Sequence, residues 1–406
     1  SRLCALLLAM ALLCSLGVPQ AAAANDAVTW SQVDNGAVTA RLPLQEAEEE
    51  AAPAYRDTDT VRISIFLEEA PTISKFDVQD IAENQAALAY RTGLETRQEA
   101  LAQVISTQAL GGEQLDVVWN LTLAANIISA NVKYGEIAAI EQVPGVEQVL
   151  IETQYAPAVV NTNLPDDPNM STSPSMIGSS AAWTAGYTGA GSRIAVIDTG
   201  TDTDHQSFSA AGFDYSLQKQ AEQAGKTVAD YDLLDVEEIT GVLDQLHVGK
   251  SVTAKQLYLN TKLPFGYNYV DKDLDITHDR DQQGEHGSHV AGISTANAYI
   301  PNADGTFSNA LDAVKVQGVA PDAQLITMKV FGKAGGAYDS DYLVAIEDAI
   351  VLKCDTVNLS LGSSNPGATR HTKAEYQAIL DRLTESGIVV AIAAGNDGSW
   401  VESARN

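Results

Sequence analysis

Short runs rich in Val and Ile alternate with segments of helical periodicity from residue 175 onward. The apolar runs cover residues 193–198, 324–330, 356–361 and 388–393, and the helical segments cover residues 286–299, 339–354 and 372–386. Runs that are apolar throughout are typical of strands buried on both faces, and strands separated by helices favour a parallel sheet. We therefore predict an α/β domain over residues 175–406, built on a doubly wound, mostly parallel sheet. Residues 209–283 interrupt the alternation with a polar, acid-rich stretch, which we interpret as a surface insertion.

A different pattern precedes this domain. Apolar residues recur at every second position from Val61 to Leu67, which predicts a strand. The elements expected after it are a helix over 77–110, strands over 114–121 and 124–132, a short helix over 134–142 and a strand over 146–151. The order β-α-β-β-α-β is that of the ferredoxin-like split unit, so we predict a ferredoxin-like α+β domain over residues 60–155. The connector 156–174 is rich in Pro and Asn and marks a domain boundary.

The first 24 residues have the composition of a secretory signal. Arg2 precedes an apolar run over residues 3–16, and small residues follow at positions 21–24. The run is shorter than the roughly 20 residues that cross a bilayer as a helix, so we favour a cleavable signal peptide over residues 1–24. A buried helix or a membrane anchor is the alternative. Residues 25–59 are acidic and lack apolar periodicity, which predicts a linker.

The charge balance limits the classes of partner. The chain has 24 Lys and Arg against 53 Asp and Glu, a formal net charge of −29. Such a negative chain repels nucleic-acid phosphates, so we expect no nucleic-acid partner, and we expect contact with a membrane only during export. Only Cys354 among the three Cys residues lies beyond the signal, which argues against an internal disulfide framework and a Cys-based zinc site.

Polar side chains stand where the predicted strands end. Asp198 closes the first run, His286 opens the helix at 286–299, and Asn396 follows the last run. Ligand chemistry in parallel sheets gathers at the carboxyl ends of the strands, so these three side chains are candidates for one site. Two of them have an ordinary alternative: Asp198 as a loop acid or helix cap, and His286 with His289 as structural or metal-binding histidines.

Five ordered motifs carry a resemblance to the subtilisin-like serine peptidases. Residues 196–200 (VIDTG) resemble the aspartate motif of that family, and residues 286–292 (HGSHVAG) resemble its histidine motif, with Ser288 where Thr is commoner. Residues 318–321 (GVAP), 358–362 (NLSLG) and 393–396 (AAGN) resemble the segments that follow, the last being the oxyanion motif. The unit at 60–151 is similar to the inhibitory propeptide of the family. The insertion and residues 264–269 (PFGYNY) are similar to its cell-envelope branch in Gram-positive bacteria.

This resemblance implies a role for each residue. His286 is expected to be the general base, because an imidazole titrates near neutral pH, and Asp198 to orient it. Asn396 is expected to donate to the oxyanion. The resemblance further implies polypeptide substrates bound along Ser360, Leu361 and Gly362, and a propeptide over 60–155 that acts as an intramolecular inhibitor until the connector is cut.

Two parts of the family pattern are missing or doubtful. The family's serine lies in a Gly-Thr-Ser helix start after the asparagine; residues 178–181 (GSSA) precede Asp198 and residues 305–308 (GTFS) are interrupted, so we assign no nucleophile in this chain. We expect the chain to stop before the nucleophile and to be inactive as it stands. No cofactor is required. A structural calcium ion among Asp271, Asp273 and Asp275 is a further possibility, the alternative being a solvated acidic loop.

The leading hypothesis is a precursor fragment of a serine endopeptidase that is secreted or associated with the cell envelope of a Gram-positive bacterium. The alternative is a non-catalytic scaffold that keeps a peptidase-like cleft for binding. A Gly-Thr-Ser helix start encoded after Asn406 favours the enzyme, and an open reading frame without one favours the scaffold.

Overall fold

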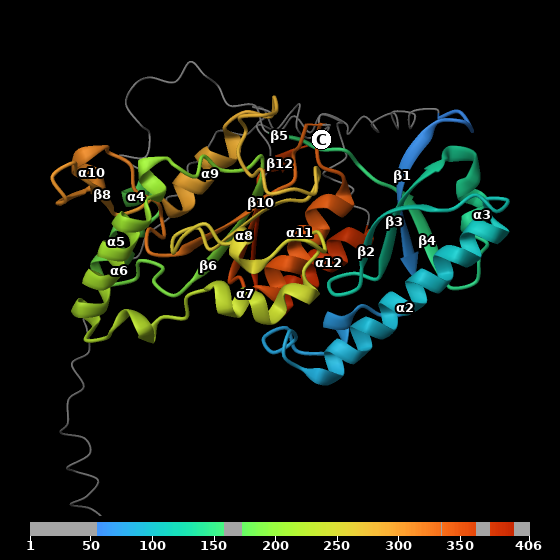
Figure 1. The fold of residues 1–406 in the computed structure, drawn as a ribbon, viewed down its shortest axis with the longest axis horizontal. Helices are drawn as coiled ribbons and strands as arrows, with labels where there is room; N and C mark the ends of the chain where they lie inside the picture. The colour runs from blue at the N-terminus through green and yellow to red at the C-terminus, as the bar shows by residue number, and fades with distance from the viewer. Residues whose placement is uncertain (1–54, 158–172, 334, 363–373, 394–406) are drawn as a thin grey trace, which may run out of the picture. The chain divides into compact units, whose positions relative to one another are not determined.

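The computed structural model describes residues 55–157, 173–333, 335–362 and 374–393. Two main sheets lie within these residues: a four-stranded sheet of order β2-β3-β1-β4 and a five-stranded sheet of order β13-β11-β6-β10-β7 (Figure 1). The predicted signal peptide, most of the acidic linker and most of the connector lie outside the described residues. Among the helices that are described, none is both long enough and apolar enough to cross a membrane.

The four-stranded sheet has the strand order of the predicted ferredoxin-like unit. Its elements are β1 (Thr60–Leu67), α2 (Gln85–Gln108), β2 (Asp116–Leu121), β3 (Ile127–Lys133), α3 (Ile137–Ile140) and β4 (Val146–Ile151). β1 pairs antiparallel with both β3 and β4, and β2 pairs antiparallel with β3. The predicted helix begins eight residues later than expected, because the Asn84 side chain accepts hydrogen bonds from the backbone N–H groups of Ala86 and Ala87 and caps the first turn.

The period-two pattern of β1 separates the two faces of this sheet. Ile63 and Ile65 are fully buried in a core shared with Ile105 of α2. Ser64 and Phe66 point to the other face, where Phe66 packs against the core of the parallel-sheet domain. The antiparallel unit (residues 60–151) therefore has its own core on one face and meets the parallel-sheet domain with the other.

The five-stranded sheet is parallel throughout, as the sequence predicts. Its strands are β6 (Arg193–Asp198), β7 (Phe265–Asn268), β10 (Gln324–Lys329), β11 (Thr356–Leu359) and β13 (Val389–Ile392), and the helices of this domain include α6 (Ala210–Ala224), α9 (His286–Thr295), α11 (Asp339–Val351) and α12 (Ala374–Glu385). β6 is central and pairs with β10 on one side and β11 on the other.

Helices cover both faces of this sheet. Ala195 and Ile197 of β6 lie in the same buried cluster as Leu343 and Ile346 of α11. Val196, which lies between them, belongs to a second cluster with residues of α9. Successive side chains of a strand point to opposite faces, so α11 and α9 lie on opposite sides of β6. This arrangement is the predicted doubly wound fold.

The interpretation of residues 209–283 as a surface insertion is wrong for part of that range. β7 lies inside it and forms an edge of the parallel sheet, with Phe265 opposite Ile326 and Asn268 opposite Lys329. The sequence FGYN lacks the Val and Ile of the other strands. Gly266 packs so closely there that a Cβ would come within 2.4 Å of Ile276 Cδ1 and would displace that side chain. Buried side chains of α6 and of two short helices, α7 (Val236–Val242) and α8 (Ala254–Leu257), also come from this range.

The remaining elements are short. They are α4 (Ser173–Met176), α5 (Ser179–Thr184), α10 (Ala310–Ala313), the hairpin of β8 (Tyr299–Pro301) with β9 (Phe307–Asn309), and the pair of β5 (Ala156–Pro157) with β12 (Leu361–Gly362). The last pair joins the end of the described range 55–157 to the end of the described range 335–362.

Candidate active site

Asp198 lies at the carboxyl end of the central strand of the parallel sheet. Only 1% of its surface is exposed. Its Oδ1 accepts a hydrogen bond of 2.7 Å from the backbone N–H of Thr199. Its Oδ2 is also buried and has no hydrogen-bond partner within the described residues. A buried carboxylate with an incomplete set of hydrogen bonds can attract a positive charge strongly, because little water competes for it.

His286, the first residue of α9, supplies the group nearest to that carboxylate. Its ring Nδ1 lies 2.7 Å from Asp198 Oδ1. A carboxylate accepts hydrogen bonds, so this contact places a proton on Nδ1 and leaves Nε2 free to accept another proton. The imidazole is 12% exposed against 1% for the Asp198 side chain. The structure thus brings two of the predicted site residues together, one of them buried and the other reachable from solvent.

The residues next to this pair explain why the helix can approach the strand so closely. A Cβ on Gly287 would lie 2.2 Å from the carbonyl oxygen of Gly200, so only glycine fits there. Thr199 Oγ1 accepts from the backbone N–H of Gly287 at 2.9 Å and donates to the carbonyl of Gly284 at 3.1 Å. Thr199 therefore fixes the backbone on both sides of His286.

A buried ion pair, which the sequence analysis did not predict, contacts the turn at Thr199. The Lys329 ammonium donates to Asp281 Oδ2 at 2.8 Å and also to the carbonyl oxygen of Thr199. The two side chains are 1% and 3% exposed. The sequence could have indicated this pair, because a lysine stands at the end of a largely apolar strand. A lysine in such a buried place is almost never without a charged partner.

The predicted substrate strand is paired with the segment that follows the antiparallel unit. β12 pairs antiparallel with β5, with Leu361 opposite Pro157 and Gly362 opposite Ala156. Ser360, just before β12, accepts a hydrogen bond of 3.0 Å from the Asn358 side chain. Leu361 and Gly362 thus hold an extended segment of the same chain.

A second segment, not predicted from the sequence, lies along the other side of that extended chain. Gln154 forms an antiparallel bridge with Tyr338, and the backbone N–H of Tyr155 donates to Ala337 O at 2.7 Å. A Cβ on Gly336 would come within 1.7 Å of the Tyr155 carbonyl oxygen, so a glycine is needed there. Residues 154–157 therefore run between residues 336–338 and β12.

The side chain of Tyr155 also enters this region. Its hydroxyl donates to Asp339 Oδ1 at 3.0 Å, and its ring meets the Tyr342 ring edge-on with centroids 5.8 Å apart. Asp339 Oδ2 accepts from the backbone N–H of Thr153 at 2.7 Å. Burial is the main cause that raises the pKa of Tyr155, so the phenol stays a hydrogen-bond donor across the physiological range.

Two buried carboxylates join the antiparallel unit to α11. Glu152 accepts from the hydroxyls of Ser64, Ser129 and Ser340 at 2.7–2.9 Å and from the backbone N–H of Ser340 at 3.1 Å. Glu347 of α11 accepts from successive backbone N–H groups of residues 122–125, the shortest of these contacts being 2.7 Å. Glu347 of α11 is satisfied mainly by the antiparallel unit, whereas Glu152 takes donors from both sides, Ser64 and Ser129 on one and Ser340 on the other.

Four other residues were predicted to serve the site or to bind calcium. Asn396 lies outside the described residues. Asp271, Asp273 and Asp275 are used by hydrogen bonds of their own loop and by ion pairs with Arg280 and Lys333. Within the part of the chain that the structure describes, no cluster of three or more His, Cys, Asp or Glu could hold a metal ion.

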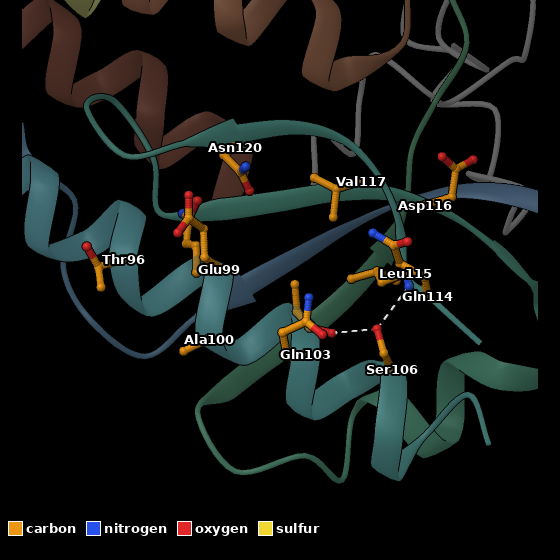
Figure 2. A pocket seen from close by; sticks show the side chains of 12 residues that line it. Thr96, Glu99, Ala100, Gln103, Ser106, Gln114, Leu115, Asp116, Val117 and Asn120 are labelled. Atoms are coloured by element: carbon orange, nitrogen blue, oxygen red, sulfur yellow. Dashed lines mark hydrogen bonds between the residues drawn. The ribbon is translucent and has the colours of Figure 1, made fainter. Parts of the chain in front are cut away.

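A separate pocket lies in the antiparallel unit, between α2 and β2 (Figure 2). Its volume is about 810 Å³, and its walls include Glu99, Gln103, Asp116 and Asn120. The backbone N–H of Leu115 donates to the Ser106 hydroxyl at 2.9 Å on one side of it. It contains none of the predicted site residues.

Comparisons with known proteins agree with the motifs. The sequence profile of the subtilase family, a family of serine peptidases, matches residues 189–405. The PI-type proteinase of Lactococcus lactis subsp. cremoris is 32% identical over 299 residues, which make up 72% of this chain and 13% of that protein. The minor extracellular protease Vpr of Bacillus subtilis is 29% identical over 238 residues, 57% of this chain and 21% of that protein. The C5a peptidase of Streptococcus pyogenes is 27% identical over 213 residues, 52% of this chain and 15% of that protein.

The chain spans about an eighth of the length of the lactococcal relatives that it matches. Among solved structures, the epidermin leader peptide processing serine protease of Staphylococcus aureus is similar with a TM-score of 0.43 and 17% identity, over 85% of this chain and 62% of that one. This likeness is too distant to carry an argument about the site.

Proposed function

Because the chain belongs to the subtilase family of serine peptidases, we propose that it is the precursor of an endopeptidase that hydrolyses peptide bonds in proteins by an Asp/His/Ser mechanism. Asp198 and His286 are the first two members of the triad. The third is a serine C-terminal to Asn396, in keeping with the subtilisin chain order of Asp, His and Ser. The observation that carries the proposal is the 2.7 Å contact between His286 Nδ1 and Asp198 Oδ1 at the carboxyl end of β6.

Each residue then has a defined task. His286 Nε2 takes the proton of the serine hydroxyl as that oxygen attacks the substrate carbonyl, and later returns it to the leaving amine. Asp198 holds the proton on Nδ1 and stabilises the imidazolium that forms. The Asn396 side-chain amide donates to the oxyanion of the tetrahedral intermediate, a contribution for which subtilisin itself gives about 10²–10³ in kcat.

The substrate lies extended along β12 in this proposal. The pairing of Leu361 and Gly362 with residues 156–157 supports this binding mode, because backbone hydrogen bonds recognise any extended polypeptide. Among the described residues, no atom lies within 4 Å of a Cβ added to Gly362, which supports space for a side chain beside the bound chain.

The antiparallel unit acts as the inhibitory propeptide. Its support is the path of residues 154–157, which occupy the space between residues 336–338 and β12 that a substrate needs. Glu152 and Glu347 hold the unit in place. Cleavage between Tyr155 and Ser175 releases it, and N-terminal sequencing of the mature enzyme locates the cut. A mature enzyme that keeps residues 60–151 contradicts this part.

The proposed location is outside the cell, either free or at the cell envelope. The signal-like residues 1–24 support it. So does the similarity to the minor extracellular protease of Bacillus subtilis. Detection of the processed protein in the medium or in the wall fraction of the producing bacterium tests this location.

The test of the proposed mechanism uses the chain extended by the coding sequence that follows Asn406. The extended protein is expected to hydrolyse a casein substrate, and His286→Ala to lower turnover by about 10⁴-fold or more. His289→Ala is the matched control, because His289 is exposed one helical turn further along α9. Normal turnover in folded His286→Ala contradicts the mechanism. An extended chain that binds casein without hydrolysing it identifies a binding scaffold instead.

A further inference from the structure

The ion pair between Lys329 and Asp281 has no role in the mechanism above, yet it touches the turn that carries the catalytic carboxylate. Lys329 is the last residue of β10 and lies opposite Asp198 in the sheet register. Its ammonium contacts the carbonyl oxygen of Thr199, the residue directly after Asp198. The backbone N–H of the same Thr199 donates to Asp198 Oδ1. One residue therefore links the buried cation to the buried anion.

Asp281 reaches this cation from the loop that leads into His286. Its carboxylate lies 2.8 Å from the Lys329 ammonium, and the following loop residues are held by the hydrogen bond between Thr199 Oγ1 and Gly284 O. The ion pair thus ties the strand end that bears Asp198 to the loop that precedes His286. It is buried almost completely, so solvent and salt screen its charges only weakly.

The charge count at this site suggests what the pair does. Lys329 and Asp281 cancel each other, so Asp198 keeps a net negative charge, and His286 is the ionisable side chain in contact with it. Without Asp281, the ammonium would neutralise part of the Asp198 charge and make the imidazole a weaker base. We propose that Asp281 and Lys329 are positioning residues, which hold the turn of Thr199 and preserve the basicity of His286; this proposal rests on the function proposed above.

Several other ionisable groups surround His286 and belong in the account. Asp202, after β6, has its backbone N–H bonded to Ser288 Oγ, and His278 lies 3.7 Å from Glu285 in the loop before the helix. His289 follows on α9. These groups are more exposed than Lys329 and Asp281, so water screens their influence on His286 more strongly.

The experiment titrates His286 directly in the full chain. The protein is labelled with ¹³C at histidine Cε1, and His286→Ala identifies the His286 signal among the six histidines. Asp281→Asn is expected to lower the pKa of His286 by about one unit, and Lys329→Met to raise it by a similar amount. The double variant Lys329→Met with Asp281→Asn removes both charges and is expected to return the pKa to near its original value.

Glu238→Gln is the matched control. Glu238 pairs with Arg193, a buried cation at the opposite end of β6, so its loss alters a comparable ion pair far along the strand from His286. It is expected to leave the His286 titration unchanged. If Lys329→Met does not fold, Asp281→Asn decides the question, because the new amide oxygen can still accept a hydrogen bond from the Lys329 ammonium.

The outcomes separate this proposal from the proposed function. An unchanged His286 pKa in folded Asp281→Asn overturns the role of the ion pair, even if the extended chain is an active peptidase. A shifted pKa supports the role without any turnover being needed. In an active extended chain, the acid limb of kcat/KM must move by the same number of pH units as the His286 pKa; a limb that stays in place overturns the proposal.

Discussion

Two buried carboxylates in different regions of the molecule have their hydrogen-bonding oxygens satisfied in opposite ways. At the contact between the antiparallel unit and α11, both oxygens of Glu152 accept hydrogen bonds, from three serine hydroxyls and one backbone N–H. At the carboxyl end of β6, Asp198 Oδ1 accepts from Thr199 and contacts His286, while Oδ2 has no partner within the described residues. Glu152 is therefore bound by neutral donors, whereas Asp198 contacts an imidazole that can become a cation.

This difference suggests that Glu152 contributes to stability and Asp198 to the reaction. A carboxylate that is satisfied by neutral donors contributes to folding and docking, and losing it leaves those donors unpaired. A carboxylate that awaits an imidazolium contributes most when the charge forms during the reaction. The comparison therefore makes opposite predictions for the two residues.

The largest expected effect comes from Asp198→Asn in the extended chain. Turnover is expected to fall by about 10⁴-fold, a loss known for this substitution in other Asp-His-Ser peptidases, because the amide no longer holds His286 in the right tautomer. The melting temperature should stay the same or rise. Steady-state kinetics and a thermal scan on the same preparation check both, and a clear loss of stability with turnover retained reverses the assignment.

The next effect concerns Glu152→Ala. Its loss leaves the hydroxyls of Ser64, Ser129 and Ser340 without their acceptor, so the free energy of unfolding should fall by about 3 kcal/mol. Glu147→Ala, at an exposed position on the strand β4 that precedes Glu152, is the matched control and should change little. Urea unfolding followed by tryptophan fluorescence measures both. Equal effects of the two substitutions would show that the hydrogen bonds of Glu152 contribute nothing specific.

The pH dependence of stability sharpens the comparison further. Burial, the largest cause, raises the pKa of Glu152 above its value in the unfolded chain, about 4.3. Below that value the carboxyl is protonated in both states. As the pH rises toward the folded pKa, the unfolded chain releases this proton first, so the folded state loses stability. Glu152→Gln should remove this slope from melting temperatures measured over pH 4–8, and identical slopes would refute the prediction.

The smallest effect is expected at Gly362 of β12, which pairs with Ala156 of β5. A Cβ added to Gly362 meets no atom of the described residues within 4 Å, so Gly362→Val should fold normally. In the extended enzyme it should lower kcat/KM for substrates with bulky side chains about tenfold more than for small ones. A uniform loss for all substrates would indicate a general distortion.

Much of the fold could be predicted from the sequence because its central strands are buried on both faces. Residues 193–198 form β6 with the predicted bounds, since a continuous run of Val and Ile has few other stable positions. β7 was missed because its sequence, FGYN, sits at an edge and is fixed by contacts of Gly266 and Tyr267 that local propensity does not encode. Tertiary packing overrides propensity at such positions.

The candidate site likewise contains residues that the sequence could predict and residues that it could not. Asp198 and His286 could be predicted because each stands at the end of a regular element, where chain direction fixes its place. The Lys329–Asp281 pair could not, since Asp281 comes from an irregular loop whose path the sequence does not reveal. The same holds for residues 336–338, which pair with residues 154–155 and have no pattern beyond the glycine pair at 335–336.

The pairing of β5 with β12 has a consequence for solubility during biosynthesis. A short strand with an unpaired edge is a template on which another extended chain can add, and neighbouring copies of a newly made protein supply such chains. In this structure that edge is occupied by Ala156 and Pro157 of the same molecule. Proline has no backbone N–H, so the occupying strand is itself a poor template for further addition. The edge of β12 that could bind an extended polypeptide is therefore covered by β5. This cover protects the edge from self-association for as long as the connector stays intact.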